Sequence, residues 1–309
     1  MRSRPADLGE EAIRAQLSTS WGLHPPALTH VPLGGGSHHW FASAPGGTKH
    51  FITVDDLDNK PWLGDDRETA FDGLRRSYET ARVLRDLARL DFVVAPLPDA
   101  AGSLLHRLDS RFTVAVFPFV QGQRLGPFEI PVEYRARVTH LLEELHAATP
   151  CVQDIALSRG LALPGRAALE NALGRLDRPW RSGPFGERAR RWLSTNEDRI
   201  RISLDVYSSL AGQVASSSTP VVTHGEPHAG NVMRTDSGLL LVDWDTVALA
   251  PVERDLWFVD GGSGRARRFY ELAWQLSDVA AFVSRLSSAH QESEDASHAW
   301  SVLAHMQQA

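Results

Sequence analysis

The chain has 309 residues, of which 42% are hydrophobic and 23% charged. This composition is typical of a soluble globular protein and argues against intrinsic disorder. The formal net charge of −6 argues against a nucleic-acid-binding protein, because such proteins usually carry a basic surface.

The single cysteine, Cys151, excludes an internal disulfide and predicts a reducing compartment, so we expect a cytoplasmic protein. We expect its side chain to be buried as a small apolar group. The longest apolar runs, 92–97 and 239–242, are far too short to span a bilayer. The charged N-terminal stretch lacks the apolar core of a signal peptide. The sequence predicts no membrane partner, and it is silent on oligomeric state.

The first third of the chain reads mostly as sheet. A short amphipathic helix is predicted over 6–19, and apolar residues on one stripe predict a second helix over 66–90. Glycine-containing turns at 34–37 and 45–47 separate the first strands. The predicted strands are 27–33, 38–44, 48–54, 92–97, 103–108 and 111–117.

The remainder of the chain reads mostly as helix. The serine run 215–219 interrupts this pattern, and two short strands, 220–223 and 238–242, follow it. The change of character near Phe117–Gln121 predicts two domains, 1–118 and 119–309. The predicted helical segments are 131–149, 166–180, 186–214 and 251–307.

The segment 224–231, His-Gly-Glu-Pro-His-Ala-Gly-Asn, concentrates groups that handle metals and protons. Its glycine and proline forbid a regular helix, so it is predicted to be a tight loop. Asn231 offers a neutral oxygen, and Asp243, at the end of an apolar strand, offers a charged one. This combination suits Mg²⁺, which takes its remaining ligands from water and substrate phosphates. Phosphoryl transfer needs such an ion and a nearby carboxylate.

These motifs resemble the aminoglycoside phosphotransferase family, a small-molecule branch of the protein-kinase-like fold. The catalytic loop of that family reads His-Gly-Asp-x-His-x-x-Asn, matched here by 224–231. Its metal-binding strand ends in Asp-Trp-Asp/Glu, matched by 243–245, and is followed by Pro251 and the Arg-Asp-Leu of 254–256. Spectinomycin phosphotransferase-like members are the most similar within the family.

The resemblance implies an α+β, bilobal protein-kinase-like fold. The N-lobe would be a five-stranded antiparallel sheet with one helix, and the C-lobe would be mainly helical. The implied reaction transfers the γ-phosphoryl group of ATP, or GTP, to a hydroxyl of an antibiotic or metabolite. Glu226 would orient or deprotonate that hydroxyl, Asn231 and Asp243 would hold Mg²⁺, and Asp245 would assist. The acidic net charge is compatible with a cationic acceptor.

Matching positions elsewhere in the chain give further expectations from the resemblance. A glycine loop would cover the phosphates, Glu79 matches a helix glutamate that normally pairs with a lysine, and a hinge would hold the adenine. Asp255 would brace the catalytic loop. The residues of the loop and the hinge are Gly34, Gly35, Gly36, Ser37, Phe119 and Val120.

The sequence departs from the family at the third strand, where Thr53 stands in place of a phosphate-contacting lysine. Lys49 has the same side-chain parity as Thr53, but four strand residues separate the two positions by about 13 Å. Lys60, in the following loop, could reach back to the site, and an arginine from elsewhere in the chain is the other candidate.

A second departure is Glu226 itself, which replaces the catalytic aspartate of the family. The extra methylene moves the carboxylate by roughly 1.5 Å. A misplaced general base would lower the rate by about 10²–10⁴-fold. The alternative is therefore a catalytically impaired pseudokinase, which binds a nucleotide or small molecule without phosphoryl transfer.

His224, Glu226 and His228 also permit a zinc-site interpretation, although the loop lacks the helical histidine pair of such sites. His224 is instead expected to bond backbone near the metal strand, and Trp244 to pack in the core. The acceptor-binding residues are the least defined. Acidic candidates in the C-terminal helices are Asp260, Glu271 and Asp278.

Overall fold

The structure is a computed structural model that describes residues 1–5, 7–25, 27–43, 47–214, 219–259 and 264–306. Contacts between residues divide the chain into two compact units. The first comprises Met1–Gly160 with Ser218–Gly262, and the second comprises Leu161–Ser217 with Ser263–Ala309. The expected boundary near residue 118 falls inside the first unit, and the two-lobe division remains a prediction. No described helix is long and apolar enough to cross a membrane.

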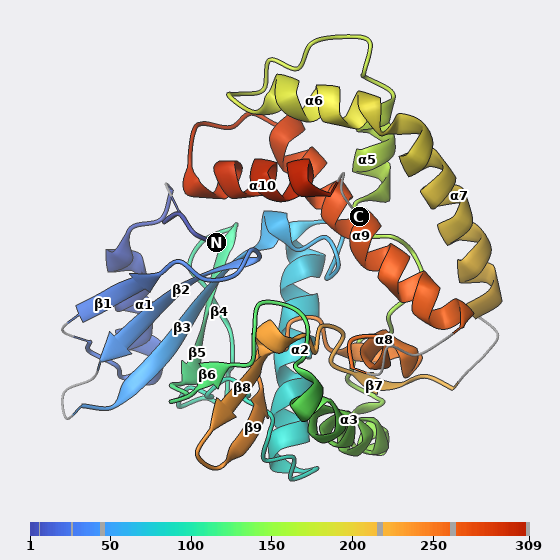
Figure 1. Cartoon of the computed structure of the whole chain (residues 1–309). Coiled ribbons are helices and arrows are strands. Elements are labelled where there is room, and N and C mark those ends of the chain that lie inside the picture. The colour runs from blue at the N-terminus through green and yellow to red at the C-terminus, as the bar shows by residue number, and fades with distance from the viewer. Residues whose placement is uncertain (6, 26, 44–46, 215–218, 260–263, 307–309) are drawn as a thin grey trace. The chain divides into compact units, whose positions relative to one another are not determined.

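The first unit contains the predicted five-stranded antiparallel sheet (Figure 1). Its strand order is β1-β2-β3-β5-β4, so consecutive strands pair with one another except β3 and β4, because β3 pairs with β5. The α+β class predicted from the sequence is confirmed. The strands are β1 (Ala27–Val31), β2 (Ser37–Ser43), β3 (Lys49–Asp56), β4 (His106–Arg107) and β5 (Phe112–Pro118).

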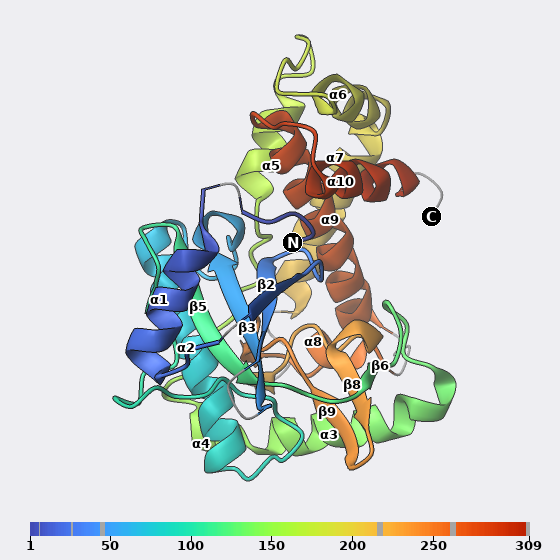
Figure 2. The same ribbon diagram turned by 90° about the vertical axis from the view of Figure 1, so that its left-hand side faces the viewer.

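Strand alternation gives the two faces of this sheet different partners (Figures 1 and 2). On one face, Ile52 and Val54 pack into a core that also holds apolar side chains of α1 (Glu10–Trp21). The opposite face meets α2 (Arg67–Asp86), which donates a hydrogen bond to Asp55 of β3. The second face therefore carries polar side chains as well as apolar ones.

Helix α2 is fixed at its start by a capping box, in which the Asp66 side chain accepts from the Thr69 N–H and Thr69 bonds back to the Asp66 backbone. Leu74 and Leu84 are buried on its core face. The helix ends at Asp86, earlier than the predicted residue 90.

Smaller elements complete the first unit and carry the loops of interest. Two short sheets, β6-β8-β9 and β7-β10, are formed by antiparallel pairing. Their strands and the short helices of this unit are β6 (Gln123–Arg124), β7 (Val221–Thr223), β8 (Val232–Thr235), β9 (Gly238–Leu241), β10 (Ala248–Ala250), α3 (Val132–Ala147), α4 (Thr149–Val152), α8 (Glu253–Leu256), η1 (Leu57–Asn59) and η2 (Ala229–Asn231).

The second unit is helical. Helix α9 packs against the other four helices, and Tyr207 of α7 stacks on Phe269 of α9 with ring centroids 4.8 Å apart. The Tyr207 hydroxyl donates to the Leu161 carbonyl at 2.8 Å. The helices are α5 (Arg166–Leu173), α6 (Gly186–Thr195), α7 (Glu197–Val214), α9 (Arg265–Ser287) and α10 (Glu294–His305).

Several local predictions need correction. Segment 92–97 is not a strand: it makes an isolated bridge to Leu241, and Pro96 has no N–H to extend a ladder. The predicted helix 186–214 is two helices, and strands β6, β8 and β10 add to the predicted set because each is too short to leave a pattern. Cys151 is exposed rather than buried. The predictions for residues 45, 46 and 215–218 lie outside the described residues.

Two helical glycines give a matched test of this packing. A Cβ at Gly73 of α2 would collide with the Leu63 carbonyl, whereas a Cβ at Gly212 of α7 would meet nothing within 4 Å. We expect Gly212→Ala to stabilise by up to about 1 kcal/mol, because alanine favours helix. Gly73→Ala should instead destabilise by about 1–3 kcal/mol. Thermal unfolding of both variants checks this, and a stabilised Gly73→Ala would contradict the packing.

Candidate active site

The loop 224–231 begins directly after β7 and turns through Gly225. This residue has a φ of +97°, a left-handed conformation that favours glycine. A Cβ there would overlap the guanidinium of Arg254, which is held at 2.8 Å by both the Thr223 hydroxyl and the Thr246 carbonyl. The buried guanidinium of Arg254 therefore fills the space beside Gly225.

A buried carboxylate holds the same loop from the start of α8. Asp255 Oδ1 accepts the Gly225 N–H at 2.7 Å, and Oδ2 accepts the His224 N–H at 3.0 Å and His146 Nε2 at 2.9 Å. Burial alone would raise the pKa of Asp255, but the partners His146 and Arg254 outweigh it and hold that pKa below its usual value. The expected bracing role of Asp255 is confirmed.

His224 ties the loop to the strand that precedes Asp243. Its Nε2 donates to the Val242 carbonyl at 3.0 Å, and its Nδ1 accepts the Glu226 N–H at 3.3 Å. Burial lowers the pKa of His224, which favours the neutral ring that this pattern requires. The ring packs on the fully buried Trp244, with centroids 4.6 Å apart, as expected for a core residue.

These bonds weigh against the zinc interpretation. Both nitrogens of His224 are already engaged, and His228 Nδ1 accepts the Gly230 N–H at 3.1 Å. The described part of the chain contains no group of three or more His, Cys, Asp or Glu residues placed to hold a metal.

Asn231 ends the loop directly before β8, and its backbone contacts the residue after β9 that precedes Asp243. Its side-chain nitrogen donates to the Glu226 carbonyl at 3.0 Å, and its backbone carbonyl accepts the Val242 N–H at 3.0 Å. The first bond uses the amide nitrogen, so the amide oxygen is the side-chain atom that can accept a cation. The second joins Asn231 to Val242, the residue that precedes Asp243. Two hydrogen bonds therefore tie Asn231 to the backbones of Glu226 and of Val242.

Asp243 has an unusual backbone and an exposed side chain. Its φ of +70° lies in the left-handed region, which aspartate tolerates better than most residues. Desolvation by the surrounding protein and the charge of Asp245 raise the pKa of Asp243, while Lys60 and Arg124 lower it in part. Negative charge is thus in excess at this point, which fits a divalent cation held by Asp243 and the Asn231 oxygen.

Beside Asp243, the ammonium of Lys60 is completely buried among three oxygen acceptors. It lies 2.5 Å from Asp245 Oδ2, 2.9 Å from Asp55 Oδ1 and 3.1 Å from Ser37 Oγ. Three acceptors match the three N–H donors of a lysine. Burial alone would lower the pKa of Lys60, but the two carboxylates outweigh it and raise that pKa, so the group stays charged.

A second ring of contacts fixes the carboxylates that surround this ammonium. Ser37 donates to Asp55 Oδ1 at 2.6 Å, and the Tyr78 hydroxyl of α2 donates to Asp55 Oδ2 at 3.0 Å. The Ser77 hydroxyl donates to the Asp245 backbone carbonyl at 3.3 Å. Burial and the nearby carboxylates raise the pKa of Tyr78, so it remains a donor.

The glycine loop leads directly into this cluster. Gly34 has a φ of +68°, and Gly35 has open space where a side chain would stand. A Cβ on Gly36 would lie 3.8 Å from Lys60 Nζ. The loop therefore places its backbone, without side chains, beside the buried ammonium.

Two predicted nucleotide contacts have other partners. Glu79 does not pair with a lysine: it binds Arg75, one turn earlier on α2, at 2.6 Å. Thr53 is buried on the same sheet face as Asp55, and its hydroxyl lies 3.4 Å from His39 Nδ1. Neither residue contacts a lysine among the described contacts. Their roles in nucleotide binding remain predictions.

The two hinge candidates follow β5 directly. Phe119 packs edge-on against Phe41, with centroids 5.4 Å apart, and Lys49 lies 5.4 Å from its ring centre. Val120 is half-buried beside the core. Among the described residues, neither Phe119 nor Val120 donates a backbone hydrogen bond, so both amides are available to a ligand.

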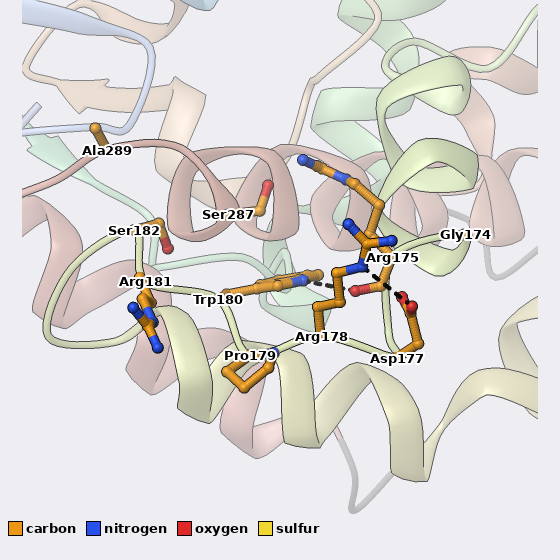
Figure 3. Close-up of a pocket in the computed structure, with 10 residues that line it drawn as sticks. All are labelled: Gly174, Arg175, Asp177, Arg178, Pro179, Trp180, Arg181, Ser182, Ser287 and Ala289. Carbon is orange, nitrogen blue, oxygen red and sulfur yellow. Dashed lines mark hydrogen bonds and ion pairs between the residues drawn. The ribbon is translucent and has the colours of Figure 1, made fainter.

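The acceptor candidates lie apart from these motifs in the chain. Glu271 is exposed on α9, and Asp278 is half-buried there, where burial raises its pKa to about 7. Asp260 lies outside the described residues. A depression of about 620 Å³ in the second unit holds none of the predicted site residues (Figure 3), and its lining is Gly174, Arg175, Asp177, Arg178, Pro179, Trp180, Arg181, Ser182, Ser287 and Ala289.

Sequence analysis missed Asp55, which binds Lys60, and Tyr78, whose hydroxyl binds Asp55. Asp55 follows Thr53 with the same strand parity, which was a usable signal for a residue on the site face. Tyr78 immediately precedes Glu79, so a shift of one residue along α2 separates the predicted contact from the observed one.

Solved structures of small-molecule phosphotransferases share this fold. Spectinomycin phosphotransferase APH(9)-Ia, in complex with ADP and spectinomycin, superposes with a TM-score of 0.72 at 15% identity, covering 98% of this chain and 95% of that one. Amicoumacin kinase hAmiN, with AMP-PNP, Ca²⁺ and Ami, gives 0.55 at 10% identity, covering 96% and 92%. The predicted kinase-like fold is confirmed.

Sequence comparison identifies a relative and a family. Protein StrN of Streptomyces griseus is 30% identical over 246 residues, covering 74% of this chain and 75% of StrN. Residues 66–289 match the sequence model of the phosphotransferase enzyme family APH. This match spans the braced loop, the metal strand and α8, and the chain belongs to the APH phosphotransferase enzyme family.

Proposed function

We propose that the protein transfers the γ-phosphoryl group of ATP, or GTP, to a hydroxyl of a small molecule. One observation carries the proposal. Two hydrogen bonds tie Asn231 to the Glu226 backbone carbonyl and to the N–H of Val242, the residue before Asp243, and this supports a shared site for the three side chains. Phosphoryl transfer depends mainly on such positioning and on charge stabilisation.

Asn231 and Asp243 would hold Mg²⁺, and Asp245, whose Oδ2 is bound to Lys60, would add negative charge beside them. When bound, the ion would supply neutralisation of charge on the phosphate oxygens. Asp243 has a left-handed backbone and is exposed to solvent, so a nucleotide would have access to it. Strain of this kind persists where surrounding structure fixes it, as the bonds of the loop do here.

Glu226 would orient the acceptor hydroxyl and take its proton. The hydroxyl oxygen then forms a bond to the γ-phosphorus, while the bond from that phosphorus to the β–γ bridging oxygen breaks and ADP or GDP leaves. The backbone of Glu226 is held on both sides, by His224 Nδ1 and by the Asn231 side chain. A fixed backbone supports a base whose longer side chain reaches the hydroxyl from a slightly greater distance.

The nucleotide would lie between the glycine loop and the hinge. Backbone amides of Gly34, Gly35 and Gly36 would cover the phosphates, with Ser37 at their end. The free amides of Phe119 and Val120 would hold the base, and Thr53 and Glu79 remain predicted contacts of this site.

The acceptor class is supported by the fold relatives and by charge. By their names, one relative is a phosphotransferase of spectinomycin and the other a kinase of amicoumacin. The net charge of −6 is compatible with a cationic molecule. Spectinomycin and aminoglycoside antibiotics are therefore the first acceptors to test, with ATP and GTP in parallel.

The first prediction concerns the metal carboxylate. Purified protein with Mg²⁺ should phosphorylate at least one member of this panel, detected by mass spectrometry as the gain of one phosphoryl group. Asp243→Asn should lower kcat/KM by about 10³-fold or more, because the metal contributes several kcal/mol to transition-state stabilisation. Asp236→Asn, the same change at an exposed aspartate of the β8–β9 turn, is the matched control.

A wild-type protein that binds nucleotide but phosphorylates nothing would favour the pseudokinase alternative. Equal activity in Asp243→Asn and wild type would contradict the metal assignment.

The second prediction concerns the base. Glu226→Gln should lower kcat by about 10²–10⁴-fold and leave the Kd for nucleotide nearly unchanged, because it removes proton acceptance but keeps size. Glu226→Asp keeps the charge and withdraws the carboxylate by roughly 1.5 Å, so we expect a smaller loss of kcat. Steady-state kinetics with a nucleotide-binding assay separate the two effects. An Asp variant faster than wild type would show that glutamate handicaps the site.

A further inference from the structure

The buried ammonium of the first unit belongs to one of only two lysines in the chain. Lys60 lies in the segment after β3, outside the matched region of the family, which begins at residue 66. Its ammonium joins three elements: Ser37 at the end of the glycine loop, Asp55 of β3, and Asp245 after the metal strand.

We propose that Lys60 contacts the phosphates of the bound nucleotide, in the role for which β3 offers only Thr53. This inference rests on the proposed function. It assigns the contact to a residue beyond β3 in the sequence, in a segment that folds back under the glycine loop.

The three partners of Lys60 are unequal, and this inequality supports the proposal. Asp55 and Asp245 are carboxylates at 2.9 and 2.5 Å, whereas Ser37 is a neutral hydroxyl at 3.1 Å. Hydrogen bonds between charged groups are roughly twice as strong as neutral ones. A phosphate oxygen arriving under the glycine loop would therefore replace Ser37 as the third acceptor. The two carboxylates would keep the ammonium in place during this exchange.

Lys60 has a carboxylate partner that differs from the expected one, Asp55 in place of Glu79. In the pattern expected from the sequence, a helix glutamate holds the lysine, but Glu79 is bound to Arg75. Helix α2 instead reaches Lys60 through the Tyr78 hydroxyl and Asp55. Lysine, carboxylate and helix are still connected in that order, by different residues.

A purely packing role explains this cluster less well. Burying an ammonium carries a large desolvation cost, and well-packed apolar residues often serve stability equally well. The position of Lys60 also supports a role in phosphate binding. A Cβ on Gly36 would lie 3.8 Å from Lys60 Nζ, so the backbone of the glycine loop is adjacent to the ammonium. Lys49, on β3, is exposed and lies over the Phe119 ring with no described carboxylate partner.

The test compares nucleotides that differ only in phosphates. By calorimetry, Lys60→Met should weaken binding of ATP and ADP by about 10–100-fold, the loss of one charged hydrogen bond, and leave adenosine binding unchanged. Lys49→Met is the matched control, and it should leave the ratio of ATP to adenosine affinity as in wild type.

Removing Lys60 alone leaves two buried carboxylates without their cation, which can prevent folding. The double variant Lys60→Met/Asp55→Asn removes one charge of each sign and keeps an acceptor for Tyr78. We expect it to melt closer to wild type than the single variant, and still to bind ATP about 10–100-fold more weakly with adenosine binding retained.

Wild-type protein gives an independent readout, because labelling with ¹⁵N-lysine marks only two side chains. Adding ADP or ATP should shift the Lys60 Nζ signal well beyond the shift that adenosine causes, whereas the Lys49 signal should not distinguish the three ligands. Each variant identifies its missing signal.

Two results overturn the assignment of Lys60. One is folded Lys60 variants that bind ATP within about twofold of wild type, and the other is a Lys60 signal unmoved by saturating ATP. Either would leave the proposed function intact. A wild-type protein that binds no nucleotide overturns both proposals together.

Discussion

The site depends on one buried carboxylate. Asp255 accepts both backbone amides at the start of the loop, from His224 and Gly225, and a third bond from His146. Arg254, its neighbour in sequence, occupies the space that a side chain on Gly225 would need. Two consecutive residues of α8 thus fix where the loop begins and how it turns. The positions of Glu226 and Asn231 follow from that geometry.

Prediction from sequence succeeded where the information was local. The residues of 224–231 and 243–245 are contiguous, and glycine, proline and strand-end signals define their turns. The five-stranded sheet and α2 also have clear periodicity. It failed for 92–97, because this apolar run has strand composition, but Pro96 within it and Pro98 after it prevent a regular ladder. Strands of two to four residues, such as β6 and β8, are too short to carry a period.

The environment of Lys60 could not be predicted for a different reason. Two of its three acceptors, Ser37 and Asp245, are 23 and 185 positions away in the sequence, so no spacing pattern relates them to Lys60. The sequence allowed Lys60 to reach back but did not say what would hold it. Glu79 and Tyr78 show the same limit: adjacent helix residues point about 100° apart, so alignment by one residue decides which of them meets the sheet.

The charges of the site explain why loop, strand and sheet belong to one functional unit. Asp55, Asp243 and Asp245 bring three carboxylates to the neighbourhood of a single ammonium, Lys60. The ammonium satisfies two of them directly, while Asp243 faces solvent with its pKa raised. Under the proposed function, a divalent cation bound together with a triphosphate would supply further positive charge at this point. Nucleotide and metal would then stabilise each other's binding, because the cation would neutralise both the phosphates and the carboxylates of the site.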